Sequence, residues 1–135
     1  MWRAALVLCG VVALAGCGGS STLNAKSLQK SAEAVQSSAA EAALVADGVA
    51  DGRTTGAFVS VHAPELGSAA DKEAKALRSA KASGDVRRKA DELSRVADRV
   101  AKLAGQVDGA DFGKARRLAD ELRREADRAK AIGGG

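Results

Sequence analysis

Apolar residues recur along most of the chain at alternating spacings of three and four, the spacing of α-helices that bury one face. The first run comprises Leu28, Ala32, Val35, Ala39, Ala42, Ala46 and Val49. Because this heptad seam winds helices side by side, we predict a helix over residues 24–51 that is capped by Asn24. Gly52 suits its end.

A second stripe follows after a short break, and we predict a helix over residues 55–82. Its members are Val59, Ala63, Leu66, Ala70, Ala74, Leu77 and Ala80. Pro64 interrupts the stripe, and a proline inside a helix removes one hydrogen bond and kinks or breaks it. Since the stripe keeps its phase, we favour one helix kinked at Pro64 over a turn followed by a helix that starts near Pro64.

Two further segments predict helices over residues 85–106, with Asp85 as a cap, and 112–131. The third seam contains Val86, Ala90, Leu93, Ala97, Val100, Ala104 and Val107, and Val96 and Leu103 widen it. The fourth contains Phe112, Ala115, Ala119, Leu122, Ala126 and Ala129. No stretch shows the two-residue alternation of a strand. We therefore predict an all-α, antiparallel, alanine-rich bundle of four helices, because short connections favour antiparallel neighbours.

Acidic and basic residues four positions apart occur on the polar faces of the last two helices. The predicted pairs are Asp91 with Arg95, Asp98 with Lys102 and Asp120 with Arg124. The acid comes first in each, which is the better orientation, and each pair contributes about 0.3 kcal/mol.

The composition limits the size of the core. Alanine supplies 31 of the 135 residues, and aromatic residues make up 2% of the chain. Small side chains bury little apolar area, and a domain of this size buries a modest fraction of its surface. We therefore expect modest stability.

The N-terminus has the organisation of an export signal. Arg3 precedes an uncharged and mainly apolar run over residues 4–15, which is too short for a transmembrane helix. The run ends in Leu14-Ala15-Gly16-Cys17, which resembles the lipobox of bacterial lipoproteins. The body also resembles small helical lipoproteins of actinobacteria in its alanine, glycine and arginine content.

The lipoprotein resemblance implies cleavage between Gly16 and Cys17 and a diacylglyceryl group on Cys17. Residues 1–16 are then the removed signal peptide, 17–23 the lipidated cysteine and flexible tether, 24–132 the bundle and 133–135 a flexible tail. The resemblance places the protein on the outer face of the bacterial cytoplasmic membrane, or in the outer membrane of a bacterium with two membranes. Cys9 lies in the signal, so the mature chain has no free thiol.

Candidate catalytic or metal-binding residues are few. His62 and Glu65 have the i,i+3 spacing found in bundle metal sites, but such sites draw ligands from several helices. A carboxylate-only site would use Glu33, Glu41 and Glu73, each of which suits a solvated face. We predict a protein that is not an enzyme and needs no cofactor.

Charge is uneven along the chain. Residues 23–66 carry a net charge of −2, whereas residues 71–130 carry +5. The candidate contacts to anionic lipids or envelope polymers are Arg87, Arg88, Lys89, Arg116, Arg117, Arg123 and Arg124. The alternative is an ordinary solvated helix surface. We predict no nucleic-acid partner, because aromatic residues for base stacking are missing.

Three functions agree with these features. The leading hypothesis is a membrane-tethered helical module that binds another envelope protein or associates with itself through an alanine-rich face. The second is a carrier of a small ligand or ion in a bundle cavity. The third is a passive envelope spacer.

Overall fold

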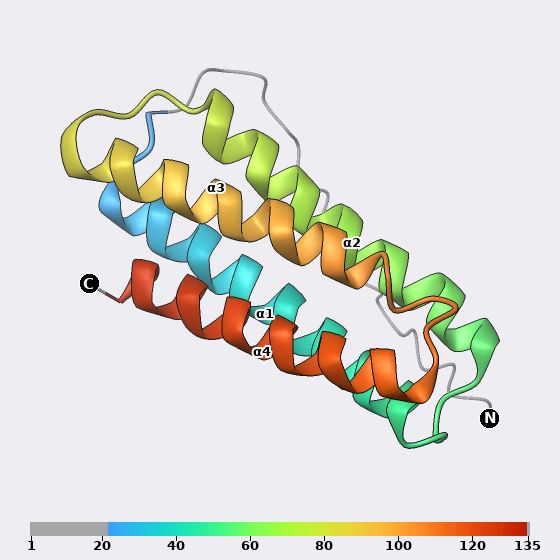
Figure 1. The fold of residues 1–135 in the computed structure, drawn as a ribbon. Helices are drawn as coiled ribbons and strands as arrows, with labels where there is room; N and C mark the ends of the chain where they lie inside the picture. Colours follow the sequence, from blue (N-terminus) through green and yellow to red (C-terminus); the bar gives the residue numbers. More distant parts are fainter. Residues whose placement is uncertain (1–21, 135) are drawn as a thin grey trace, which may run out of the picture.

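The computed structural model describes residues 22–134, which form four helices in an antiparallel bundle (Figure 1). The helices are α1 (Ala25–Ala50), α2 (Gly56–Ser79), α3 (Gly84–Ala104) and α4 (Phe112–Gly133). The predicted all-α bundle is confirmed, and the described residues include no strand beyond one isolated bridge between Thr22 and Lys81. The predictions for the signal segment and Cys17 lie outside the described residues.

Side-chain caps fix the starts of three helices. The Asn24 carboxamide accepts a hydrogen bond from the Ser27 backbone N–H at 2.9 Å, and the Ser27 hydroxyl accepts one from the Asn24 N–H at 2.9 Å. The Thr55 hydroxyl caps α2, and the Asp111 carboxylate accepts a bond from the Lys114 N–H at 2.7 Å. Each cap satisfies N–H groups that have no partner inside the helix. The predicted cap at Asn24 is confirmed.

Pro64 lies inside one continuous helix rather than at the start of a new one. Its side chain is on the exposed side of α2, and Ser60, the residue whose carbonyl loses its helical hydrogen bond, is exposed as well. Water can therefore satisfy that carbonyl, which explains why the bundle tolerates the proline.

The end of α2 and both ends of α3 differ from the predicted boundaries. α2 ends at Ser79 rather than at residue 82, since Ala80 is extended and the Lys81 carbonyl accepts a hydrogen bond from the Leu23 N–H at 2.8 Å. α3 begins at Gly84, directly after Ser83, and ends at Ala104. Asp85 was predicted as its cap but lies in the first turn, where its negative charge still suits a helix N-terminus.

The other end of the chain is more ordered than predicted. α4 continues past residue 131 to Gly133, and Gly134 is its C-cap. A Cβ atom on Gly133 would lie 2.6 Å from the Ala32 Cβ of α1, so the missing side chain permits close contact between these helices. The prediction of a flexible tail from residue 133 is therefore wrong for Gly133, which is the last residue of α4.

The predicted seams form the core with few exceptions. Nearly all seam residues of α1, α3 and α4 are buried, including Val35, Leu93, Val100 and Leu122. Phe112 is an exception, with 66% of its surface exposed, because it is the first residue of α4 and precedes the first packed turn. The alanines of the seams are buried inside the bundle, except Ala80, so their contacts are made within the chain.

The helices do not pack equally closely. α1 makes its most extensive contact with α4, and α2 with α3, whereas α3 and α4 share the smallest contact of the neighbouring pairs. Gly67 of α2 illustrates the close contacts, because a Cβ atom there would lie 3.1 Å from the Ala101 carbonyl oxygen of α3. The α3–α4 boundary is therefore the least closely packed one between helices that follow each other along the chain.

Leu122→Ala is expected to lower the free energy of unfolding by about 3 kcal/mol, because it leaves a cavity among fully buried side chains. Leu44→Ala is the matched control, since Leu44 is 69% exposed and its truncation should change stability by less than about 0.5 kcal/mol. Urea denaturation followed by circular dichroism measures both. Equal losses in the two variants would contradict the assignment of the core.

Candidate interaction groove

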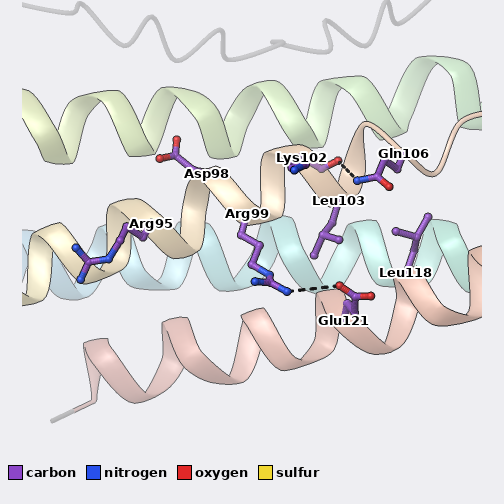
Figure 2. Close-up of a pocket in the computed structure, with 8 residues that line it drawn as sticks. All are labelled: Arg95, Asp98, Arg99, Lys102, Leu103, Gln106, Leu118 and Glu121. Atoms are coloured by element: carbon purple, nitrogen blue, oxygen red, sulfur yellow. Dashed lines mark hydrogen bonds and ion pairs between the residues drawn. The ribbon is translucent and has the colours of Figure 1, made fainter.

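A groove runs along the loose boundary between α3 and α4. Three adjoining hollows of about 550, 440 and 300 Å³ make it up. The first two share Arg95 and Arg99 in their walls, and the second and third share Glu92 and Arg128. Figure 2 shows the largest hollow, with the arginines of α3 on one side and Glu121 of α4 on the other.

The floor of the groove is apolar except at Glu125 and comes from both helices. On α3 the floor is formed by Val96 and Leu103, which are seven residues apart. On α4 it is formed by Leu118, the buried Glu125 and Ile132, which are also spaced by seven residues. Two heptad rows thus meet along the seam, and one position of the α4 row carries a carboxylate instead of an apolar side chain.

Glu125 is the buried charge of the groove, with 3% of its surface exposed. Its Oε1 atom lies 3.1 Å from Arg99 Nε across the seam and 3.1 Å from Arg128 Nη1 on its own helix. Arg99 also approaches Glu121, with 3.7 Å between Nη2 and Oε2. A buried carboxylate needs such partners, because an unpaired charge in the interior is costly. The groove is therefore bridged by ion pairs where a closed seam would have apolar contact.

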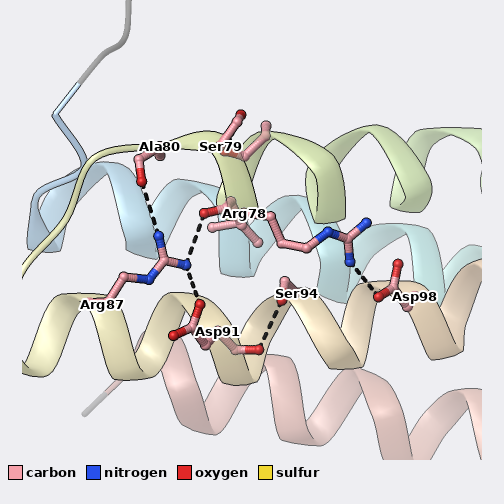
Figure 3. Close-up of polar contacts among 9 residues, drawn as sticks. Arg78, Ser79, Ala80, Arg87, Asp91, Ser94 and Asp98 are labelled. Atoms are coloured by element: carbon pink, nitrogen blue, oxygen red, sulfur yellow. Dashed lines mark hydrogen bonds and ion pairs between the residues drawn. The ribbon is translucent and has the colours of Figure 1, made fainter.

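The structure pairs the acidic residues of α3 and α4 differently from the prediction. Asp98 bonds to Arg78 of α2, with 2.5 Å between Arg78 Nη1 and Asp98 Oδ2 (Figure 3). Asp91 bonds to Arg87, and Asp120 lies 3.1 Å from Arg123 Nη1. The three predicted i,i+4 pairs are therefore wrong. Asp91 pairs with the arginine four residues before it, Asp120 with the arginine three residues after it, and Asp98 with an arginine of the neighbouring helix.

This rearrangement leaves cations without partners beside the groove. Arg95, Lys102, Arg117 and Arg124 make no side-chain ion pair within residues 22–134. Arg95 and Lys102 line the groove on α3. Arg117 and Arg124 are exposed and lie on the same helical stripe of α4 as Glu121 and Arg128, which line the groove. Both rims therefore carry unpaired positive charge.

Arg87, a predicted contact to anionic surfaces, is part of the fold. Its Nη1 donates to the Ala80 carbonyl at 3.0 Å, and its Nη2 donates to the Leu77 carbonyl at 3.1 Å (Figure 3). It also bonds to Asp91. The Leu77 carbonyl lies in the last turn of α2 and the Ala80 carbonyl follows the helix, so neither receives a hydrogen bond from an N–H group of α2. Arg87 therefore caps α2 from the neighbouring helix.

The other predicted basic contacts are spread over the bundle. Arg88 and Lys89 approach Asp85 at the start of α3. Arg116 Nη2 lies 2.9 Å from Asp51 at the end of α1, and Arg123 bonds to Asp47. α3 and α4 are antiparallel, so their starts lie at opposite ends of the bundle (Figure 1). The structure therefore does not bring the predicted basic residues together in one patch.

His62 and Glu65 lie on the surface of α2. Their closest atoms, Nδ1 and Oε2, are 3.6 Å apart, and 47% of the His62 side chain is exposed. The Phe58 ring centre is 4.1 Å from that of His62. Residues 22–134 contain no group of three or more His, Cys, Asp or Glu side chains able to hold a metal ion. The acidic candidates Glu33, Glu41 and Glu73 therefore do not form such a group either.

The start of the described chain is fixed at one end of the bundle. The hydrogen bond from Leu23 to Lys81 ties the segment before α1 to the loop between α2 and α3. Leu23 also packs against the core. Gly16 and Cys17 lie outside the described residues, and no helix within residues 22–134 is long and apolar enough to cross a membrane.

Comparisons with models of protein families, with curated proteins and with solved structures find no match to this chain.

Arg87→Ala is expected to lower the free energy of unfolding by about 2 kcal/mol, because two partly buried carbonyls lose charge-assisted hydrogen bonds. Arg88→Ala is the matched control on the next residue, since the exposed Arg88–Asp85 pair contributes less than about 0.5 kcal/mol. Chemical denaturation compares the two variants. A loss at Arg88 as large as that at Arg87 would refute the capping role.

Proposed function

We propose that this protein is a bacterial lipoprotein whose helical bundle is a non-catalytic module for binding another envelope protein. The observation that carries the proposal is the α3–α4 groove, which combines an apolar floor with unpaired cations on both rims. Such a surface offers an apolar contact area together with charges that select a partner. The sequence Leu14-Ala15-Gly16-Cys17 supports the membrane anchor.

The hydrogen bond between Leu23 and Lys81 would bring one end of the bundle close to the proposed membrane anchor. If the mature chain begins at Cys17, five residues separate the lipidated cysteine from Leu23, and they span at most about 20 Å. The loop at Lys81 then lies near the bilayer. α3 extends away from that loop over 21 residues, or about 32 Å. With the bundle axis directed away from the bilayer, the far part of the groove would lie beyond the lipid headgroups, within reach of a neighbouring envelope protein.

The physical chemistry of the anchor explains why a single cysteine is sufficient. Each buried CH₂ group contributes about 0.8 kcal/mol, and one acyl chain gives only reversible membrane binding. Two chains on one cysteine hold the protein for long enough to act at a fixed place. The bundle itself then needs no membrane-binding surface.

Cys17→Ala should abolish incorporation of labelled fatty acid and release the protein from the membrane fraction or leave its signal uncleaved. Cys9→Ala is the matched control, because Cys9 lies within the predicted signal and should leave labelling unchanged. Metabolic labelling, membrane fractionation and intact-mass measurement of the full chain report the outcome. Unchanged mass and unchanged membrane retention of the Cys17 variant would contradict the anchor.

A further inference from the structure

We propose that the α3–α4 groove binds an acidic amphipathic helix of the partner protein, which lies along the seam as a fifth helix. This inference rests on the proposed function of the bundle as a protein-binding module and specifies the chemistry of its partner. Binding of an amphipathic helix in a groove between helices is a recurrent mode of recognition.

The dimensions of the groove suit a helix. Its walls extend from Lys89 of α3 to Gln106 in the turn just after that helix, which corresponds to about 25 Å at 1.5 Å per residue. A partner helix of about 17 residues has the same length. The three hollows adjoin along this line, so one continuous ligand fills the groove better than separate small ones.

The rims repeat with the period of a coiled coil. Arg95 and Lys102 are seven residues apart on α3, and Arg117 and Arg124 are seven residues apart on α4. In coiled coils, charged residues at this spacing flank the apolar seam and select the partner helix. A helix with a leucine stripe flanked by glutamates would place a carboxylate near each of these cations. Arginine suits this contact because its guanidinium binds carboxylates in a bidentate manner.

The surrounding charge favours an acidic partner over a second copy of this chain. The groove and its rims carry seven basic side chains against four acidic ones. The basic residues are Lys89, Arg95, Arg99, Lys102, Arg117, Arg124 and Arg128, and the acidic residues are Glu92, Asp98, Glu121 and Glu125. The exposed stripe of α1 is the longest helical surface that a second copy could offer. It carries Lys26 and Lys30 together with Glu33 and Glu41, so it does not complement the groove.

The position of the cations also favours a protein over a membrane surface. Arg95, Lys102, Arg117 and Arg124 are distributed along α3 and α4, whereas the chain enters the bundle beside Lys81 at one end. A bilayer near that end would meet only the nearest of them. An extended helical partner contacts both rows along their length.

The test uses the full lipidated chain in nanodiscs of zwitterionic lipid. The probe is a fluorescein-labelled peptide of three heptads, with leucine at positions a and d and glutamate at e and g. We expect fluorescence anisotropy to show saturable binding. Arg95→Glu with Arg124→Glu should weaken the affinity at least tenfold, and Arg95→Gln with Arg124→Gln should weaken it by a smaller factor.

Lys26→Glu with Lys30→Glu is the matched control, because it makes the same charge change on the exposed side of α1 and should leave the affinity within twofold. A peptide of the same composition with a scrambled order should bind at least tenfold more weakly. Circular dichroism confirms that each variant is folded. The glutamine variant isolates the loss of the cations from the repulsion that new glutamates introduce.

Three results would overturn the proposal: no saturable binding, equal binding of the scrambled peptide, or equal losses in the groove and control variants. Phosphatidylglycerol vesicles provide a separate arm. Binding to these vesicles that depends on Arg95 and Arg124, without binding of the peptide, would identify a lipid headgroup as the ligand. The peptide assay reports on the groove and the fatty-acid labelling reports on Cys17, so a chain that is labelled at Cys17 but does not bind the peptide would overturn this proposal and leave the membrane anchor standing.

Discussion

The close approach of helices through alanine is the constraint on which the rest of the structure depends. Alanine seams let α1 lie against α4 and α2 against α3, and Gly67 and Gly133 extend these contacts where even a methyl group would crowd the neighbour. Small side chains also bury little apolar area, so each contact stabilises the bundle only slightly. Polar bonds between helices, such as Arg78 to Asp98 and the cap made by Arg87, add to the contact between α2 and α3.

The α3–α4 seam departs from this scheme, and the departure creates the groove. The α4 row Leu118, Glu125 and Ile132 would be apolar throughout in a fully closed bundle. Glu125 instead draws Arg99 and Arg128 to the boundary, and their long side chains hold polar groups where apolar side chains would meet. Proteins often keep such locally unfavourable features where a binding surface is needed. The cations without ion-pair partners on both rims of the groove agree with a binding surface at this place.

The sequence predicts the helices well because helix formation depends on local signals. The spacing of apolar residues and the Asn24 cap identify α1 nearly to its ends, and the continuous stripe through Pro64 identifies α2 as one helix. The ion pairs are poorly predicted, since Asp98 finds Arg78 twenty positions away on another helix. Periodicity shows which face of a helix is apolar, but it does not show how far apart two helices lie. The groove was therefore missed, although the heptad spacing of Leu118, Glu125 and Ile132 was a usable signal.

The free energy of unfolding of Glu125→Leu tests the central claim, that the α3–α4 seam is left incomplete by its buried charge. Leucine would complete the apolar row, and Arg99 and Arg128, whose side chains are 57% and 61% exposed, can turn into water without leaving a buried charge. The account predicts that urea denaturation will show a gain of about 2 kcal/mol. A loss of stability of about 2 kcal/mol or more would contradict it. Such a loss would show that the Glu125 ion pairs hold α3 against α4.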